Sequence, residues 1–226
     1  KLLKFYMKKF NFKRKINLLD FKNIEKKILK KDSINLINVD YKFKKKQFKK
    51  ISKNSKKFIN KSFKIALDLI NSGLTNKLIN GPISKKKFLD KKYPGITEYI
   101  AKKSKVKNIA MLIYNKNLSV CPLTTHMPLK KVHKNINKKN IYNKIKLIDL
   151  FYKKMRNIRP NIAVLGLNPH CESTDKFNED EKIIKPSIQK LINLGYKVSG
   201  PYSADTIFLK NNKEKFDVIL GMYHDQ

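Results

Sequence analysis

Residues 216–226 read FDVILGMYHDQ, an apolar run that passes directly into a tyrosine, a histidine, an aspartate and a glutamine. A short apolar run bounded by polar residues is typical of a strand buried inside a sheet. In open α/β sheets, ligands bind just outside the carboxyl ends of the strands. The stretch therefore predicts a core strand over residues 216–223 and a candidate binding site immediately after it.

The same arrangement occurs at two earlier places in the chain. His126 in PLTTHMP follows a predicted strand over 118–123, and His170 in GLNPHCES follows a predicted strand over 163–167, as His224 follows the last one. Imidazole is a good ligand for zinc and related divalent metals, and three protein ligands leave a fourth position open for chemistry. We therefore predict a metal site at His126, His170 and His224, with three unrelated loop histidines as the alternative. His133 follows no predicted strand and is interpreted as solvated.

Polar neighbours of these histidines have two possible roles each. Thr124 and Thr125 either contact a ligand or close the end of their strand. Asp225 either orients a ligand histidine or caps the next turn. Asp205, in GPYSADTIF, either accepts a substrate amine or is the N-cap of a short helix.

The other apolar segments alternate between strand and helix periodicity. This alternation predicts an α/β architecture with a mostly parallel sheet. Gly73 and Gly195 mark the ends of two of the helices. The expected strands are 34–39, 77–80, 109–114, 118–123, 163–167, 196–200 and 216–223, and the expected helices are 58–71, 137–157 and 179–194.

The chain is strongly basic, with 53 Lys and Arg against 17 Asp and Glu and a net charge of +36. A polyanion partner would fit this charge, and the segment 41–58 interleaves aromatic residues with lysines as single-strand binders do. Against this, the lysines are spread along the chain and only Arg14, Arg156 and Arg159 could form bidentate contacts. We therefore regard a compositional bias as the better explanation, with a nucleic-acid-binding protein as the rival function.

The length, the hydrophobic fraction and the number of cysteines limit the class of protein. The 226 residues are 41% hydrophobic, enough for a substantial core, and contain no apolar stretch long enough for a membrane span. The two cysteines, Cys121 and Cys171, form no disulfide framework and fit a reducing cytoplasm. The opening KLLKFYMKKF fits a signal peptide poorly, and the absence of an initiating Met suggests an excerpt.

Six motifs in order resemble the 4-hydroxythreonine-4-phosphate dehydrogenase family of pyridoxal phosphate biosynthesis. They are NGPISK (80–85), GITEYIA (95–101), PLTTHMPLKKV (122–132), GLNPHCES (166–173), GPYSADTIF (200–208) and MYHDQ (222–226). The resemblance covers roughly residues 80–226. It implies an α/β, two-domain fold like those of isocitrate and isopropylmalate dehydrogenases, here expected to be truncated at both ends.

The resemblance also implies a domain division, a cofactor and site residues. We expect a partial cofactor-side domain over 1–82, and a metal, substrate and dimerisation region over 83–226. The family's metal ligands fall on His126, His170 and His224, with His170 supplied across a homodimer interface. Thr97 is implied as substrate-binding, and we predict Asp205 and Lys85 as catalytic. NAD is implied without a glycine-rich dinucleotide loop, and the metal could be zinc, magnesium, cobalt or manganese.

The implied activity is the NAD- and metal-dependent oxidation and decarboxylation of 4-phosphohydroxy-L-threonine to 3-amino-2-oxopropyl phosphate, in the cytoplasm. Two departures from the family pattern bear on the substrate, since Ile96 and Ser84 stand where the family usually has histidines. Losing the histidine at position 96 removes a polar substrate contact. A related four-carbon phosphorylated acid, such as threonate or erythronate phosphate, is therefore the alternative substrate.

Overall fold

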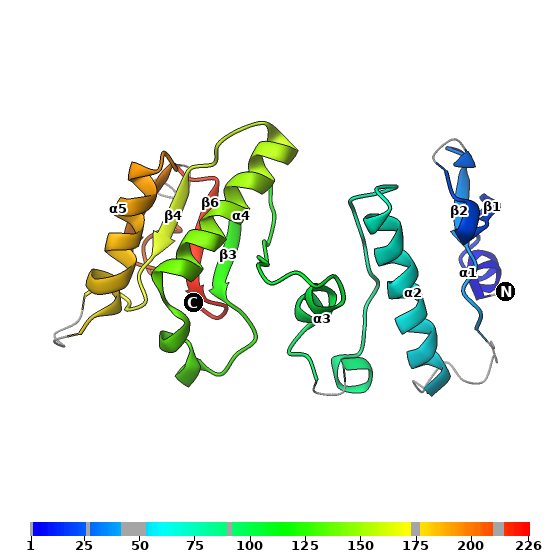
Figure 1. The fold of residues 1–226 in the computed structure, drawn as a ribbon, viewed down its shortest axis with the longest axis horizontal. Helices are drawn as coiled ribbons and strands as arrows, with labels where there is room; N and C mark the ends of the chain where they lie inside the picture. The colour runs from blue at the N-terminus through cyan, green and yellow to red at the C-terminus, as the bar shows by residue number, and fades with distance from the viewer. Residues whose placement is uncertain (1, 26–27, 42–52, 90–91, 173–176, 210–214) are drawn as a thin grey trace. The chain divides into compact units, whose positions relative to one another are not determined.

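The computed structural model describes residues 2–25, 28–41, 53–89, 92–172, 177–209 and 215–226 (Figure 1). The chain divides into two compact units, Lys1–Asp90 and Lys91–Gln226. The boundary predicted between residues 82 and 83 falls inside the first unit. The cofactor, substrate and dimerisation roles expected of the two regions stay predictions.

The first unit contains a small parallel sheet, whose two strands lie between two helices in the chain order. Strand β1 (Lys15–Leu19) pairs in parallel with β2 (Ser33–Ile37), between α1 (Leu2–Lys9) and α2 (Lys53–Asn71). Strand β2 was predicted, whereas α1 and β1 were not, because this lysine-rich region has weak apolar periodicity. Helix α2 begins earlier than the predicted residue 58. The unit also contains short turns of 3-10 helix over Phe21–Asn23 and of π-helix over Lys85–Leu89.

The end of α2 follows from glycine chemistry. Helix α2 ends at Asn71, and Gly73 adopts a φ of 76°, a left-handed conformation that costs glycine little. The Gly73 backbone N–H donates to the Ile70 carbonyl and so closes the last turn. The predicted helix end is confirmed.

Two of the predicted strands are corrected by the structure. Residues 77–80 form no strand, and Ile79 is 96% exposed, so this short apolar run has no sheet to be buried in. Residues 109–114 contribute only one antiparallel bridge, between Ile113 and Val120. The predicted strand over 109–114 is therefore reduced to a single contact at the edge of the main sheet.

The second unit is built on a four-stranded parallel sheet in the order β3-β6-β4-β5. The strands are β3 (Ser119–Thr124), β4 (Ile162–Leu165), β5 (Val198–Tyr202) and β6 (Val218–Tyr223). Each neighbouring pair is parallel. The mostly parallel α/β architecture predicted from the alternation of segments is confirmed.

The core of this unit shows the strict alternation of a sheet that is covered on both faces. In β4, Ile162 and Val164 belong to one apolar cluster, and Ala163 and Leu165 belong to another. All four are at most 2% exposed. Strands buried on both faces read as continuous apolar runs, which is why residues 162–165 and 218–222 carry no polar side chain.

Helices α4 (Lys138–Arg156) and α5 (Lys185–Asn193) cover the first of these faces and contact each other (Figure 1). Helix α4 begins at Asn137, whose side chain accepts a hydrogen bond from the Asn140 backbone N–H at 2.9 Å. The predicted helix over 179–194 begins instead with a π-helical turn, Asp180–Ile184, that leads into α5. A further helix, α3 (Ile96–Lys103), and two 3-10 turns, Leu129–Lys131 and His133–Asn135, complete the unit.

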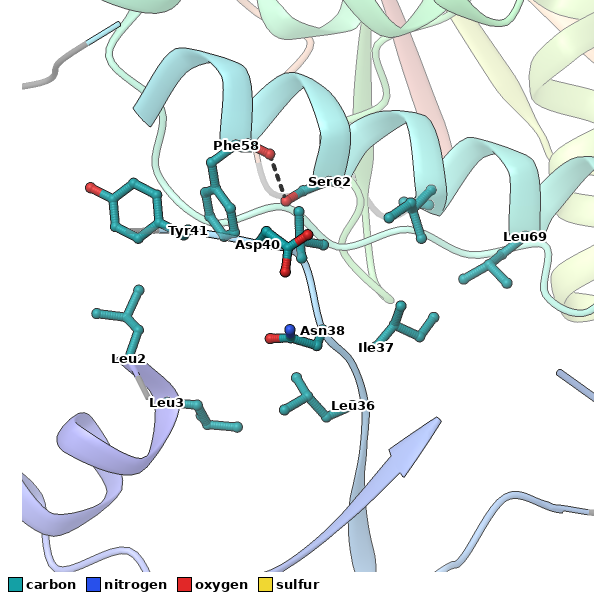
Figure 2. A pocket seen from close by; sticks show the side chains of 13 residues that line it. Leu2, Leu3, Leu36, Ile37, Asn38, Asp40, Tyr41, Phe58, Ser62 and Leu69 are labelled. Carbon is teal, nitrogen blue, oxygen red and sulfur yellow. Dashed lines mark hydrogen bonds between the residues drawn. The ribbon is translucent and has the colours of Figure 1, made fainter. Parts of the chain in front are cut away.

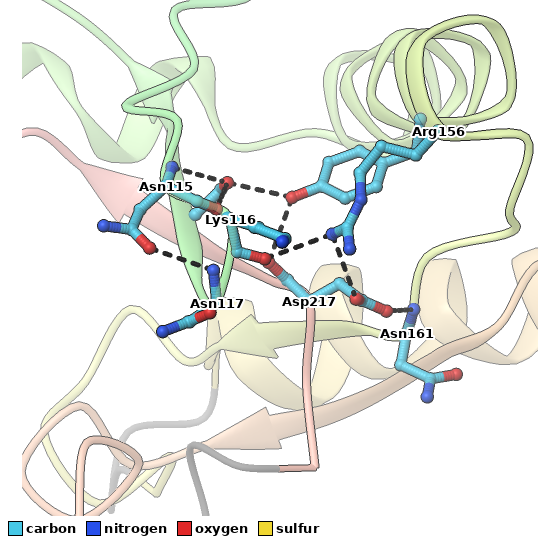
Figure 3. Close-up of polar contacts among 8 residues, drawn as sticks. Asn115, Lys116, Asn117, Arg156, Asn161 and Asp217 are labelled. Carbon is cyan, nitrogen blue, oxygen red and sulfur yellow. Dashed lines mark hydrogen bonds and ion pairs between the residues drawn. The ribbon is translucent and has the colours of Figure 1, made fainter.

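A polar cluster ties the amino ends of β3, β4 and β6 together (Figure 3). The hydroxyl of Tyr152 donates to Ser119 Oγ at 2.8 Å and to the Asp217 carbonyl at 3.2 Å. The Asp217 carboxylate accepts from the Asn161 backbone N–H at 2.9 Å and lies 3.9 Å from the Arg156 guanidinium. The chain segments before β4 and β6 are thereby fixed to the start of β3 and to the end of α4.

Across the residues that the structure describes, no helix is both long enough and apolar enough to span a membrane.

Candidate functional site

The sheet order brings the three predicted histidine loops to one edge. Strands β3, β6 and β4 are consecutive and parallel, so the segments that follow them leave the sheet at the same edge. Thr124 in β3 lies opposite Tyr223 in β6. His126 and His224 therefore start from neighbouring positions, although nearly a hundred residues separate them in the chain.

Two of the three histidines lie close together. The ring centroids of His126 and His224 are 5.9 Å apart, with planes inclined at 31°. His170 is exposed, and no group of three potential metal-ligating side chains occurs within the described parts of the chain. The structure thus brings His126 and His224 together within one subunit, and the contribution of His170 from across a dimer interface stays a prediction.

Each of these two histidines has a carboxylate at its Nδ1 atom. Glu98 Oε1 lies 3.3 Å from His126 Nδ1, and Asp225 Oδ1 lies 2.9 Å from His224 Nδ1. Imidazoles that bind metals usually donate one N–H to a carboxylate or a carbonyl, which leaves the other nitrogen for the metal. The arrangement leaves both Nε2 atoms as potential ligands. Of the two roles considered for Asp225, contact with His224 is the one that the structure shows.

Glu98 sits in a partly buried environment beside His126. Thr125 Oγ1 donates to Glu98 Oε1 at 3.0 Å, and Glu98 Oε2 is buried with no hydrogen-bond partner. Burial by itself would raise the pKa of the Glu98 carboxyl. Hydrogen bonds from its own backbone N–H, His126 and Thr125 outweigh this effect and leave that pKa below its ordinary value. The charged form of Glu98 is therefore favoured next to the imidazole.

Gly95 is required by the close approach of these two side chains. A methyl group placed on Gly95 would lie 2.7 Å from Glu98 Oε2 and 2.8 Å from His126 Nδ1, far inside normal contact distances. The φ of Gly95 is −155°, which any residue can adopt, so space and not backbone conformation demands glycine here. The residue is the N-cap position of α3, and it lets the first turn of that helix pack against the imidazole.

The loop that carries His170 is organised by a buried carboxylate. Asp180 is fully buried and accepts hydrogen bonds from the Leu167 and Asn168 backbone N–H groups at 2.6 and 3.2 Å and from Asn168 Nδ2 at 2.8 Å. The Cys171 backbone N–H donates to the Asn168 carbonyl and closes the turn. The sequence had placed Asp180 in the first turn of a helix, where anions are favoured. The structure shows that its side chain also shapes residues 167–171.

Gln226 connects the ends of two neighbouring strands. Its Oε1 accepts from the Met222 backbone N–H at 2.6 Å, and its Nε2 donates to the Gly166 carbonyl at 2.7 Å. Thr124 makes a similar link, since its Oγ1 donates to the Met222 carbonyl at 2.8 Å. For Thr124, the strand-closing role is the one that the structure shows, whereas Thr125 contacts Glu98.

The structure gives less information about the other predicted site residues, Thr97, Lys85 and Asp205. Thr97 is half-buried in the first turn of α3. The side chain of Lys85 lies outside the described part of the chain. Asp205 is exposed and does not begin a helix: a single turn joins the Ile207 N–H to the Ser203 carbonyl, and Ser203 Oγ accepts the Asp205 N–H at 3.3 Å. The N-cap alternative for Asp205 is wrong, and its catalytic role, like those of Thr97 and Lys85, stays a prediction.

Sequence reasoning missed Glu98, Gly95 and Gln226 as site residues. Glu98 and Gly95 lie within the quoted motif GITEYIA, and Gln226 ends MYHDQ, so all three were in view without an assigned role. The available signal was the residue type. A carboxylate or an amide in a motif that also carries predicted site residues is a candidate for orienting a ligand histidine.

The basic segment 41–58 is only partly described, since residues 42–52 lie outside the described residues. Tyr41 and Phe58, near its two ends, contact each other with ring centroids 5.0 Å apart. Both line a pocket of about 640 Å³ in the first unit together with Leu2, Leu36 and other apolar side chains (Figure 2). These two rings contact each other and line a largely apolar pocket, which is a structural role and does not require a nucleic acid.

The parallel sheet, its covering helices and the histidine-bearing edge define an α/β dehydrogenase fold of the isocitrate and isopropylmalate dehydrogenase type, as expected. The model of the family described as "Pyridoxal phosphate biosynthetic protein PdxA" matches residues 1–226. The chain belongs to this family.

Curated relatives carry two different names. A 4-hydroxythreonine-4-phosphate dehydrogenase of Sulfurihydrogenibium sp. is 40% identical over 153 residues, which are 66% of this chain and 47% of the relative. A D-threonate 4-phosphate dehydrogenase of Pectobacterium atrosepticum is 36% identical over 135 residues, which are 59% of this chain and 41% of the relative. The chain thus aligns with about half the length of these relatives.

Solved structures give the same family. The 4-hydroxythreonine-4-phosphate dehydrogenase of Klebsiella pneumoniae superposes with a TM-score of 0.76 at 25% identity, covering 94% of this chain and 66% of that one. The corresponding protein of Burkholderia phymatum gives a TM-score of 0.75 at 27% identity, covering 94% of this chain and 65% of that one.

Proposed function

We propose that this chain acts as a dehydrogenase that uses NAD and a divalent metal to oxidise and decarboxylate 4-phosphohydroxy-L-threonine, giving 3-amino-2-oxopropyl phosphate for vitamin B6 biosynthesis. The observation that carries the proposal is the pair His126 and His224, which end neighbouring strands with rings 5.9 Å apart and a carboxylate at each Nδ1. The names of the relatives supply the substrate class.

The donor set fits a divalent cation. His126 and His224 would hold the cation through their Nε2 atoms, and His170 of the partner subunit would be the third ligand. Imidazole ligands suit zinc better than magnesium or manganese, which prefer oxygen ligands, and a site with three protein ligands keeps a position free for substrate. A divalent cation bound there supplies Lewis-acid chemistry, lowering the pKa of a substrate hydroxyl and stabilising developing negative charge.

The chain's own residues would bind and orient the substrate around that edge of the sheet. Thr97, in the first turn of α3, would contact the substrate, and Asp205 would accept a hydrogen bond from its amine. Lys85 would contact the phosphate. The net charge of +36 would also raise the local concentration of an anionic substrate by electrostatic steering.

The overall chemistry balances with NAD as the oxidant. NAD, when bound, would accept a hydride from the substrate's secondary alcohol with release of a proton, and the resulting β-keto acid would lose carbon dioxide. The residues that contact NAD are not assigned. A homodimer is part of this proposal, because His170 is proposed to act from the partner subunit.

A second substrate is favoured by one position in α3. Ile96 cannot form the polar contact that a histidine would form there, so the site recognises one substrate group less strongly. D-Threonate 4-phosphate, the substrate in the name of one relative, has a hydroxyl where 4-phosphohydroxy-L-threonine has an amine. It is the alternative substrate.

The proposal is tested by substituting the histidine pair. We expect His126→Ala and His224→Ala to lose zinc or cobalt binding in calorimetric titrations, and to lose NADH formation with either substrate. His133→Ala is the matched control, because His133 is an exposed histidine in a 3-10 turn of the same unit. Unchanged metal affinity in both variants would reject the metal site. NADH formed with only one of the two substrates would identify which of them the chain uses.

A further inference from the structure

We infer that Glu98 is a positioning residue for His126: its carboxylate holds the imidazole in the tautomer that keeps the proton on Nδ1 and leaves Nε2 free as a ligand. The inference rests on the proposed metal site and adds a residue with no role in it so far. Three independent features of the structure support it, namely the contacts of the carboxylate, its burial, and the space around it.

The first feature is the set of donors around Glu98. Oε1 lies 3.3 Å from His126 Nδ1 and 3.0 Å from Thr125 Oγ1, so one carboxylate oxygen engages two consecutive residues of the loop after β3. A free imidazole in water can place its proton on either nitrogen. A carboxylate at Nδ1 can only accept a hydrogen bond, so this contact requires the proton to be on Nδ1.

The second feature is the small number of groups that stabilise the Glu98 charge: besides its own backbone N–H and a longer-range attraction to Lys144, they are His126 and Thr125. Its Oε2 atom is buried and makes no hydrogen bond, and its only ion pair in the described residues is with His126. An ionised carboxylate that is partly buried is stabilised mainly by the donors that remain in contact with it. The carboxylate therefore fixes the positions of the His126 imidazole and the Thr125 hydroxyl, and these two groups in turn fix the carboxylate.

The third feature is the tight packing at Gly95. The space that a Cβ atom of residue 95 would take is filled by Glu98 Oε2 and the His126 ring, at 2.7 and 2.8 Å from the ideal Cβ position. The backbone of His126 is itself in the left-handed region, with a φ of 46°. Both the ring and the carboxylate thus pack against the Gly95 backbone, which limits their movement on that side.

The contact also explains how two sequence motifs cooperate. Glu98 lies on α3 and His126 on the loop after β3. The carboxylate therefore links the position of α3 to the orientation of the His126 ring. Carboxylates that orient ligand histidines typically change metal affinity by roughly 10- to 100-fold when removed. Glu98 would have an effect of this size although it does not touch the cation.

The first test measures the tautomer without any metal. Two-dimensional ¹H–¹⁵N spectra of the full-length, metal-free chain report which nitrogen of His126 carries the proton. We expect the Nδ1–H form in the unmodified chain and a shift towards the Nε2–H form in Glu98→Ala. An unchanged tautomer in Glu98→Ala overturns the inference, whatever the outcome of metal binding.

The second test measures cobalt or zinc affinity by calorimetry. We expect Glu98→Ala to bind roughly 10- to 100-fold more weakly, with Glu98→Gln between the two because its amide oxygen can still accept from Nδ1–H. Gly95→Ala, which keeps the carboxylate but crowds it against the ring, should also weaken binding. Circular dichroism establishes that each variant is folded.

Glu181→Ala is the matched control, since the Glu181 side chain forms an exposed ion pair with Lys185 in the same unit. It should bind metal like the unmodified chain. If the unmodified chain binds no metal, the proposed metal site fails, while the tautomer measurement still decides the role of Glu98. If the unmodified chain binds metal and Glu98→Ala binds it equally well, the inference about Glu98 fails and the metal site stands.

Discussion

At the scale of single residues, chemistry near the site is set by contacts between segments far apart in sequence. Glu98 and His126 are brought together by contact between α3 and the loop after β3, and His126 and His224 by strand pairing. The individual histidines were visible in the sequence because each follows an apolar run. Their partners were not, because no periodicity links a helix residue to a loop residue in another segment.

A buried thiol gives a residue-scale prediction about pH. Cys121 is fully buried in the core, and burial raises the pKa of its thiol from an ordinary 9.0 to about 11. Below about pH 9 the thiol is protonated in both the folded and the unfolded chain, so it adds no pH dependence. Above that pH the unfolded chain loses the proton while the folded chain keeps it, so stability falls until the pH passes the folded pKa.

The measurement is the free energy of unfolding by urea at several pH values between about 8 and 11. We expect the unmodified chain to lose roughly 1–2 kcal/mol more across this window than Cys121→Ala does. The comparison removes the contributions of the tyrosines and of the lysines other than Lys144, which interacts with the Cys121 thiolate. Parallel curves for the two proteins would contradict the assigned burial of the thiol.

At the scale of secondary-structure elements, the periodicity of apolar residues correctly predicted the strands and helices that have a clear local pattern. The strands over 118–123, 163–167, 196–200 and 216–223 and the helices over 58–71 and 137–157 are all present with shifted bounds. The strand predicted over 77–80 was wrong because a tetrapeptide with only two apolar residues forms a strand only where a partner strand is available. Helix α3 was missed because its eight residues include only two buried side chains, Tyr99 and Ala101, which is too weak a pattern to read.

The polar cluster at the amino ends of the strands gives an element-scale prediction (Figure 3). Tyr152→Phe removes the hydroxyl that bonds Ser119 Oγ and the Asp217 carbonyl. We expect it to lower the free energy of unfolding by about 1–2 kcal/mol, because a buried hydrogen-bonded group loses its partner. Chemical denaturation followed by circular dichroism provides the measurement.

Tyr114→Phe is the control for this change, since Tyr114 is 49% exposed and packs near the same helix. It should alter stability by no more than about 0.5 kcal/mol. Equal effects of the two substitutions would mean that the cluster does not fix α4 to the sheet. Because the cluster lies at the amino ends of the strands, metal affinity at the carboxyl ends should be unchanged in Tyr152→Phe.

At the scale of the whole molecule, the two units differ in how much they bury. Both apolar clusters of the four-stranded sheet lie within residues 91–226, whereas in the first unit the described core residues are mainly Phe63, Leu67, Phe88 and Leu89. Stability scales with the apolar area that is removed from water. The second unit should therefore be the more stable of the two.

This difference predicts separate unfolding. A fragment of residues 91–226 should fold alone and keep the tautomer of His126, and the full chain should melt in two steps, the later of which coincides with the melting of the fragment. Residues 1–90 alone should melt at the lower temperature or remain unfolded. Differential scanning calorimetry of all three proteins makes the comparison. A single transition in the full chain, combined with an unfolded 91–226 fragment, would show that the two units depend on each other.

The sheet separates the residues that hold the fold from those that face a ligand. Apolar side chains fill strands β4 and β6 on both faces, while every candidate ligand-binding group lies in a loop or in the first turn of a helix. Substitutions in those loops can change substrate specificity without creating a cavity in the hydrophobic core. The relatives carry two names, 4-hydroxythreonine-4-phosphate dehydrogenase and D-threonate 4-phosphate dehydrogenase, so one scaffold is associated with two different phosphorylated acids.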